Sequence, residues 1–135
     1  FVDILDLESI QALAATLYQN ERPLHGTAGL VDWHFPKVVS DFVRSGAVSG
    51  KSGELVCVPV VYRDRPVKVL LLGNGENERP GERPRVSDAL LRTLGEQLLR
   101  MRVETVALEA KDFGVKTKKE VEALLRGVQI VWVGE

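Results

Sequence analysis

Residues 20–33 read NERPLHGTAGLVDW, and this stretch is the most informative part of the chain. It opens with turn-forming residues and continues as a short apolar segment. Gly26 and Thr27 suit the start of a helix, because both residue types are favoured where the first helical turn leaves its N–H groups unpaired. Four apolar residues then supply one surface of the helix: Ala28, Leu30, Val31 and Trp33. The stretch therefore predicts a turn followed by a short helix.

The composition is typical of one globular domain spanning residues 1–135. Of these residues 44% are hydrophobic and 27% are charged, and a chain of this length buries roughly two thirds of its unfolded surface. The formal net charge of -1 gives no overall field that would attract nucleic acid or an anionic membrane. No apolar run approaches the roughly 20 residues of a membrane span, and no basic-then-apolar leader opens the chain. We therefore expect a cytoplasmic protein that does not enter a membrane.

The segments on either side of residues 20–33 predict further short elements. Residues 2–7 alternate between apolar and acidic side chains, which indicates a strand. Residues 12–18 are ambiguous, because their apolar residues have helical spacing while the segment is also short enough for a strand. Pro36 suits a first helical turn and predicts a second helix over residues 36–44 or 36–45, ended by Gly46. This helix is expected to bury four apolar residues: Val38, Val39, Phe42 and Val43.

The second half of the chain alternates strands with helices. Residues 54–62 predict a strand whose Pro59 indicates an edge or a bulge, and a turn follows over residues 63–66. Residues 67–72 are almost entirely apolar, as in a central strand covered on both faces. One helix begins after Ser87, with Gly95 allowing close approach of a neighbour, and a second begins at a capping box of Thr117 and Glu120. Strands are also expected over residues 103–110 and 128–133, the last of them buried.

This order of elements predicts an α/β domain with three α/β/α layers and a mixed, largely parallel sheet. Several motifs make the prediction more specific. They are Glu21-Arg22-Pro23-Leu24, Gly26, Ala28-Gly29-Leu30-Val31-Asp32-Trp33, Ser40, Arg44-Ser45-Gly46 and Gly53-Glu54. This set resembles the N-terminal domain of the M17 leucyl aminopeptidases, which has a macro-like fold, although Pro36 departs from the family's pattern. The resemblance favours a strand over residues 12–18, against their helical spacing.

The resemblance also implies a function. In that family the chemistry belongs to a second domain that carries two metal ions, and the sequence contains none of that domain's motifs. We therefore expect no peptidase activity, catalytic residue, cofactor or metal in this chain on its own. The resemblance implies an interaction, assembly or regulatory module of a peptidase-type system, which self-associates into an oligomer or docks on a partner chain. The candidate interface residues are Trp33, Phe35 and Trp132.

The alternative function is binding of a small anionic ligand such as a nucleotide or ADP-ribose, which macro domains bind as a superfamily. Glycine-rich loops at the carboxyl ends of parallel strands can direct backbone N–H groups toward phosphate. Two segments have this character and supply the candidate ligand-binding residues: Gly26, Thr27, Ala28 and Gly29 in one, and Gly73, Asn74 and Gly75 in the other. Both segments are equally compatible with ordinary turns, and Glu76, Glu78 and Glu82 would oppose a phosphate nearby.

Other chemically active residues show no catalytic arrangement. His25 and His34 are nine residues apart, whereas two metal ligands on a helix would be three or four apart. Cys57 is the single cysteine, and its position in the apolar run 55–61 indicates a buried, neutral thiol. Acidic neighbours interrupt the one basic cluster, so nucleic-acid binding is not expected. That cluster consists of Lys111, Lys116, Lys118 and Lys119.

Overall fold

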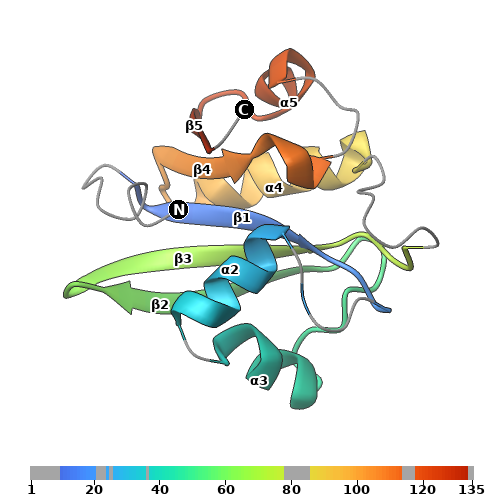
Figure 1. Ribbon diagram of the computed structural model, residues 1–135. Helices are drawn as coiled ribbons and strands as arrows, with labels where there is room; N and C mark the ends of the chain where they lie inside the picture. Colours follow the sequence, from blue (N-terminus) through green and yellow to red (C-terminus); the bar gives the residue numbers. More distant parts are fainter. Residues whose placement is uncertain are drawn as a thin grey trace.

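The computed structural model describes residues 10–20, 24, 26–35, 37–77, 86–113 and 118–133. Its elements follow the expected alternation of strands and helices (Figure 1). In chain order they are β1 (Ala12–Leu17), α2 (Gly26–His34), α3 (Val38–Arg44), β2 (Leu55–Tyr62), β3 (Arg65–Gly73), α4 (Asp88–Arg100), β4 (Thr105–Glu109), the 3-10 helix η1 (Ala110–Phe113), α5 (Lys118–Leu124) and β5 (Gln129–Val133).

The five described strands form one mixed sheet in the order β2-β3-β1-β4-β5. β1 is parallel to both of its neighbours, β3 and β4, and β5 is parallel to β4, whereas β2 is antiparallel to β3. Helices α2 and α3 lie on one face of the sheet and α4 lies on the other (Figure 1). The three-layer α/β/α architecture and the largely parallel sheet are therefore as predicted.

The central strand β1 explains why the sequence of this segment suggests a helix. All six residues are buried, because β1 is paired on both edges and covered on both faces. Leu13, Ala15 and Leu17 pack toward α2 and α3, while Ala12 and Ala14 pack toward α4. A strand buried on both faces loses the apolar-polar alternation by which strands are recognised. The strand that the family resemblance favours is confirmed.

The β2–β3 hairpin is tighter than the sequence indicates. Its turn consists of Arg63 and Asp64, which both have positive φ angles of 49° and 63°, as in two-residue hairpin turns. Arg65 already belongs to β3, so the expected four-residue turn is wrong by two residues. β2 lies at the edge of the described sheet, which confirms the position that Pro59 predicts.

Cys57 is exposed, and the expectation of a buried thiol is wrong. The cause is the alternation of side chains along β2. Val58, Val60 and Tyr62 point into the core beside α2 and α3, while residues 57, 59 and 61 point to the opposite face. At this edge of the sheet that face is exposed, so an apolar run does not imply burial of every side chain.

Helix α4 matches its prediction closely. The Ser87 side chain caps it by accepting a hydrogen bond from the N–H of Leu90 at 3.1 Å. A Cβ atom at Gly95 would lie 3.2 Å from Cδ2 of Leu125, which confirms that this glycine admits a neighbouring segment. The buried side of the helix carries four leucines: Leu90, Leu91, Leu94 and Leu98.

Two burial expectations need correction. In α3 only Val39 is buried, while Val38, Phe42 and Val43 are half-buried at the margin of the same core, because this short helix lies over the outside of the layer. β5 is half-buried rather than buried, since within the described residues β4 is its one neighbouring strand. The strand expected over residues 2–7, the interruption at Pro36 and the Thr117 capping residue lie outside the described part of the chain.

The loop between α3 and β2 packs tightly over the carboxyl end of β3. A Cβ atom at Gly73 would overlap the carbonyl oxygen of Lys51 and lie 2.9 Å from Cβ of Glu54. At Gly50 it would lie 2.6 Å from the backbone of Tyr18, and Gly50 also has a φ of +91°. Two glycines therefore allow this loop to cross the ends of β1 and β3 in direct backbone contact.

This contact predicts that Gly73→Ala destabilises the domain by about 3 kcal/mol, the upper range for overpacking a rigid site. Gly46→Ala is the control: its Cβ would meet nothing within 4 Å, and only its φ of +82° opposes the change. The expected cost there is about 1 kcal/mol. Urea unfolding of both variants measures the difference, and equal losses would contradict the tight loop packing.

Candidate ligand-binding edge

The carboxyl ends of β1, β3 and β4 meet at one edge of the sheet, because these three strands are parallel. We call this the carboxyl edge; it comprises residues 18–20, 74–77 and 109–112 together with the start of α2 at Gly26 and Thr27. In open α/β sheets, ligands bind at the carboxyl ends of the strands. Both candidate ligand-binding segments therefore lie at the same edge.

The segment after β3 has its backbone fully engaged with neighbouring loops. Each of its three candidate N–H groups donates to a carbonyl oxygen of another segment: Gly73 to Glu54 at 2.7 Å, Asn74 to Leu17 at 2.9 Å, and Gly75 to Gly50 at 2.9 Å. In this arrangement the three N–H groups are not available to bind a phosphate. Gly73, Asn74 and Gly75 have a structural role here, and a direct contact with a ligand stays a prediction.

Asparagine side chains fasten this segment to the end of β1. The Asn20 amide donates to the Asn77 carbonyl at 2.8 Å, and its oxygen accepts from the Asn77 N–H at 2.8 Å. The Asn74 amide donates to the hydroxyl of the buried Tyr18 at 3.3 Å. Sequence reasoning named Asn74 as a candidate ligand contact but missed Asn20 and Asn77, because the pairing of two strand ends 57 positions apart is visible only in the folded chain.

At the start of α2 the Thr27 side chain bonds to a distant carboxylate. Its hydroxyl donates to Oε2 of Glu109, at the end of β4, at 2.7 Å, and Thr27 is only 5% exposed. Gly26 has a φ of 62°, which suits glycine at this first position. Ala28 is buried in the core, and a Cβ at Gly29 would lie 2.7 Å from the Leu24 carbonyl oxygen. Thr27 therefore links two elements, and no sequence signal identified Glu109.

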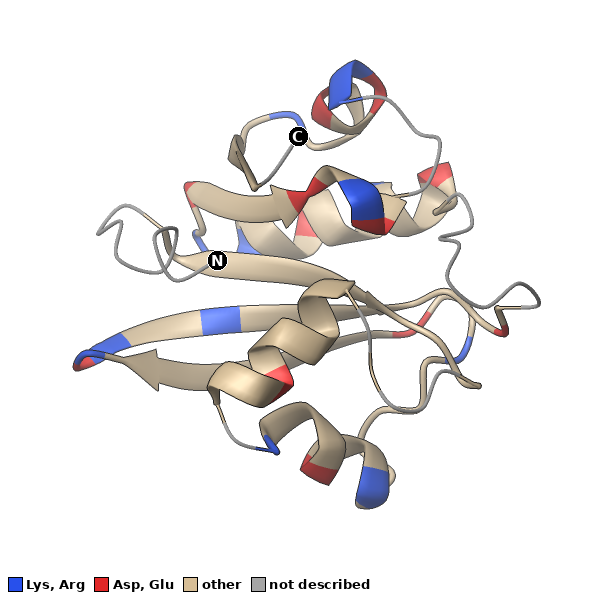
Figure 2. Cartoon of the chain, in the orientation of Figure 1, with Lys and Arg blue, Asp and Glu red and all other residues tan. Residues whose placement is uncertain are grey.

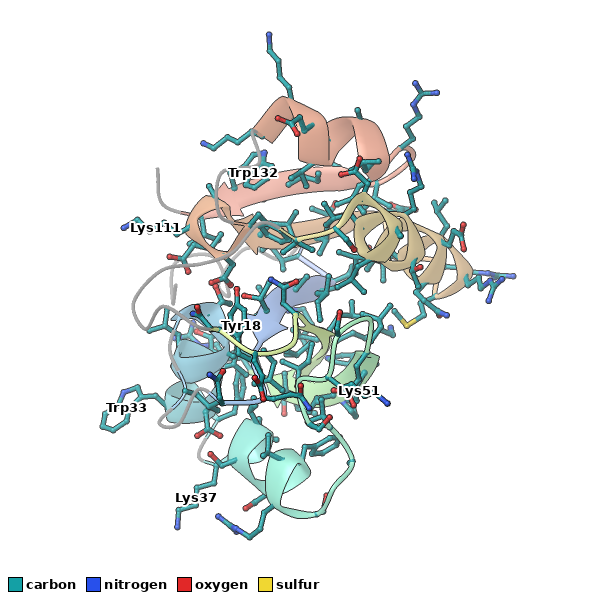
Figure 3. The ribbon with its side chains drawn as sticks, turned by 90° about the vertical axis from the view of Figure 1, so that its right-hand side faces the viewer. Tyr18, Trp33, Lys37, Lys51, Lys111 and Trp132 are labelled. Atoms are coloured by element: carbon teal, nitrogen blue, oxygen red, sulfur yellow. The ribbon has the colours of Figure 1, made fainter. Side chains whose placement is uncertain are left out.

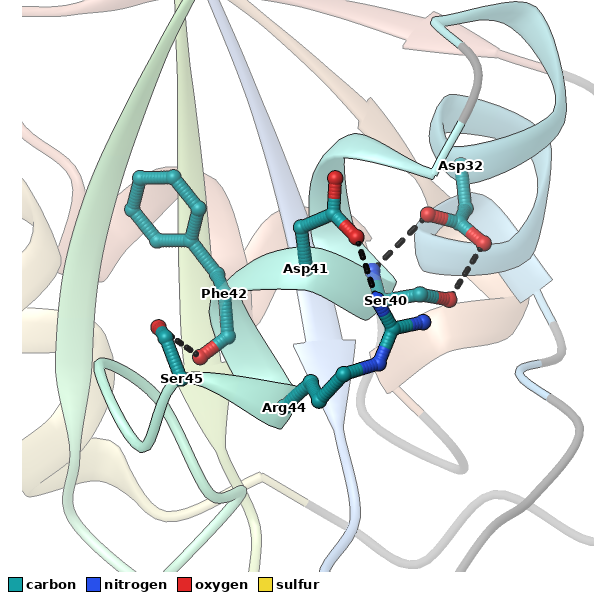
Figure 4. A network of polar contacts seen from close by, with 6 residues as sticks. All are labelled: Asp32, Ser40, Asp41, Phe42, Arg44 and Ser45. Atoms are coloured by element: carbon teal, nitrogen blue, oxygen red, sulfur yellow. Dashed lines mark hydrogen bonds and ion pairs between the residues drawn. The ribbon is translucent and has the colours of Figure 1, made fainter.

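Asp32 and Ser40, which contribute to the family resemblance, connect the two helices on the α2 face. The Asp32 carboxylate accepts from the Ser40 N–H at 2.8 Å and from its hydroxyl at 2.7 Å (Figure 4). Arg44 forms an exposed ion pair with Asp41 at 2.9 Å, which contributes little to stability. Asp32 and Ser40, two residues of the family motif, therefore hold α2 and α3 together and have no catalytic arrangement.

The candidate interface residues differ in exposure. Trp33 is 85% exposed, and its indole ring points away from the body of the molecule (Figure 3). Phe35 is half-buried and packs edge-on against Tyr62, with ring centroids 6.5 Å apart. Trp132 is also half-buried, and its Nε1 donates to Glu122 at 3.0 Å. Of the three residues, Trp33 alone has a fully presented ring.

The charges give no sign of a nucleic-acid or metal site in the part of the chain that the structure describes. Basic and acidic residues are interspersed along the elements (Figure 2). Lys118 lies over the Trp132 ring at 5.6 Å, so one lysine of the basic cluster has an intramolecular contact. Among the described residues, no group of three or more His, Cys, Asp or Glu side chains is placed to hold a metal ion. None of the described helices has the length and apolar character that a membrane crossing requires.

Two opposing effects act on the Cys57 thiol. The thiol is exposed but partly shielded by its neighbours; this partial burial raises its pKa, because removal of water disfavours the thiolate, and the positive charge of Lys68 lowers the pKa in part. In the described chain no base is paired with this thiol by hydrogen bond. The arrangement is that of an accessible but weakly ionised cysteine, not of an activated nucleophile.

Comparisons with known proteins identify the fold. No protein-family profile matches the chain, and no curated protein does. Among solved structures, the macrodomain of Mycobacterium tuberculosis DarG matches with a TM-score of 0.67 and 18% identity, covering 92% of this chain and 88% of that one. Thermosipho africanus DarTG in complex with ADP-ribose matches with a TM-score of 0.58 and 18% identity, covering 93% of this chain and 39% of that one.

A tomato leucine aminopeptidase variant also matches, with a TM-score of 0.56 and 15% identity. The match covers 93% of this chain and 25% of the aminopeptidase, so the chain corresponds to about a quarter of that enzyme. Together these neighbours establish a macro-like fold, as predicted.

The environment of Cys57 predicts that iodoacetamide modifies the thiol in the native protein, with a rate that keeps rising above the usual thiol pKa of about 8.5. Lys68→Met removes the charge that stabilises the thiolate, so the pKa rises further and alkylation at pH 8 slows by about twofold. Mass spectrometry against time measures both rates, with Lys51→Met as the control. A native thiol that does not react, or no effect of Lys68→Met, would contradict this description.

Proposed function

We propose that this chain is a ligand-binding macro-like domain whose carboxyl edge accepts a nucleotide-type ligand of the ADP-ribose class. The observation that carries the proposal is the similarity in fold, over 93% of the chain, to a protein solved in complex with ADP-ribose. The M. tuberculosis macrodomain supports the macro-like fold on which the proposal rests, because the match spans most of both chains. Fold similarity does not fix a ligand by itself, so the chemistry of the edge has to agree.

The carboxyl edge offers groups suited to the neutral parts of such a ligand. Asn20 and Asn74 place side-chain amides at the ends of β1 and β3, where they bond to Asn77 and Tyr18, and an amide can donate to and accept from a base or a ribose that replaces these partners. The nine-residue helix α2 starts at the same edge, and a helix start favours a pyrophosphate. The candidate contacts are the backbone of Gly26, Thr27, Ala28 and Gly29. Gly73, Asn74 and Gly75 adjoin them at the same edge and would contact a ligand in exchange for their bonds to Glu54, Leu17 and Gly50.

The proposal includes no chemistry on this chain alone. In the M17 enzymes that residues 20–33 resemble, the peptidase reaction belongs to another domain, and this chain matches a quarter of the tomato enzyme. Descent from such an enzyme, and a cytoplasmic location, are parts of the proposal. The ligand-binding role does not depend on either.

Titration with ADP-ribose tests the proposal. We expect saturable binding in calorimetry, with amide chemical-shift changes at residues 26–29 and 73–75 in two-dimensional NMR spectra. Arg63 and Asp64 form the turn at the opposite edge and serve as the internal control, where no change is expected. Absence of heat and of shift changes at millimolar ADP-ribose would refute the proposal, and changes confined to the hairpin would place binding elsewhere.

A second candidate function is assembly, either with another copy of the chain or with a peptidase-type partner chain. The observation that favours it is the exposure of Trp33 on α2, one helical turn after the exposed Leu30. Large aromatic side chains are frequent anchors of protein interfaces.

If the chain self-associates through this helix face, Trp33→Ser raises the dissociation constant of the oligomer by about 30-fold or more, as removal of an aromatic anchor does. Sedimentation velocity over a range of concentrations measures the change. Trp132→Phe is the control, since that ring is half-buried against α5. A wild-type chain that stays monomeric at high concentration would exclude self-association and leave only docking on a partner.

A further inference from the structure

Several hydrogen-bond donors at and beside the carboxyl edge are bound to the protein's own carboxylates. Glu109 accepts the Thr27 hydroxyl at 2.7 Å. In the loop that crosses β1 and β3, Oε1 of Glu54 accepts the N–H groups of Ser49 and Gly50 at 3.0 and 2.8 Å. The carboxylates of Glu109 and Glu54 therefore accept hydrogen bonds from donors that could otherwise bind a phosphate.

Glu109 also provides a negative charge that α2 lacks in its own sequence. The first turn of α2 contains no acidic residue, although the positive end of a helix dipole favours one there. Glu109 comes from the end of β4, 82 positions away, and its bond to Thr27 brings its carboxylate to the first turn of α2. The contact therefore joins the start of α2, which follows β1, to the end of the neighbouring strand β4.

We propose that the Glu109–Thr27 contact is an autoinhibitory latch that lowers the affinity of the carboxyl edge for anionic groups. With the latch closed, a pyrophosphate group approaching α2 meets the charge of Glu109 and finds the Thr27 hydroxyl already used. An anionic ligand binds by displacing the Glu109 side chain, after which the start of α2 faces the ligand. The proposal rests on the proposed function, because it concerns the same edge.

The latch distinguishes charged ligands from neutral ones. Displacement of the Glu109 carboxylate is favourable only for a ligand that supplies its own negative charge to the start of α2. Such a ligand is first repelled by Glu109, and this repulsion lowers its affinity. A neutral nucleoside gains nothing from displacing Glu109. The charge of Glu109 therefore affects the affinity for ADP-ribose and for inorganic pyrophosphate, but not the affinity for adenosine.

Glu109→Gln is the informative variant. Glutamine keeps a side-chain oxygen that accepts from Thr27, so the fold is retained, while the negative charge is lost. Glu104→Gln is the matched control, because this exposed glutamate precedes the same strand at the opposite edge and the substitution changes the net charge equally. Calorimetric titrations of the wild type and both variants use ADP-ribose, inorganic pyrophosphate and adenosine, and thermal melts confirm folding.

We expect Glu109→Gln to bind ADP-ribose and pyrophosphate about tenfold more tightly than the wild type, the effect of one partly exposed unit charge at short range. Glu104→Gln leaves both affinities within about twofold, since an exposed charge at the far edge is screened by salt. Adenosine affinity is the same in all three proteins. Binding of the two anionic ligands to Glu109→Gln alone would also support the latch, and would mean that it keeps the wild-type edge closed.

The contrary results separate the latch from the proposed function. If the wild type binds ADP-ribose and Glu109→Gln binds it no more tightly, the latch is refuted and the proposed function stands. An equal gain in Glu104→Gln would assign the effect to net charge and also refute the latch. If neither the wild type nor Glu109→Gln binds any of the three ligands at millimolar concentration, the latch and the ligand-binding function both fail.

Discussion

The structure depends on the burial of β1 in the middle of the sheet. β1 is hydrogen-bonded on both edges, to β3 and to β4, and both of its faces are covered by helices. Its small alanine side chains leave room for α2 on one face and α4 on the other. A buried strand must satisfy all of its backbone groups, and β1 does so by pairing with a strand on each side. Because both pairs are parallel, the carboxyl ends of the three strands meet at one edge.

The carboxyl edge is a self-contained polar structure. Backbone carbonyls accept the N–H groups of residues 73–75, two glutamates accept donors around the start of α2 and the crossing loop, and asparagines join the ends of β1 and β3. Gly50 and Gly73 make this possible, since a side chain at either position would collide with backbone atoms. The glycines that suggest a phosphate loop serve first to bring backbone segments together.

The same fold occurs in proteins with different tasks. The solved neighbours include DarG macrodomains and a leucine aminopeptidase, at 15–18% identity to this chain. Similarity at this level establishes the arrangement of the layers, whereas the function depends on the side chains at the edge. In this chain those side chains include Glu109, whose carboxylate accepts from Thr27 at the start of α2.

The sequence by itself determined the elements whose causes are local. The Ser87 cap and the leucine stripe of α4 depend on neighbours along one helix, and Pro59 marks an edge strand wherever that strand lies. The macro-like fold also followed from the motifs around residues 20–33. For residues 12–18 the family resemblance favoured a strand against the local periodicity, and the tertiary structure supplied the physical cause. The tertiary structure alone decided the exposure of Cys57 and the partner of Thr27. In each case the cause depends on how segments far apart in the chain are arranged. Helices cover both faces of β1, no described element covers the Cys57 side of β2, and the carboxylate that bonds to Thr27 comes from 82 positions away.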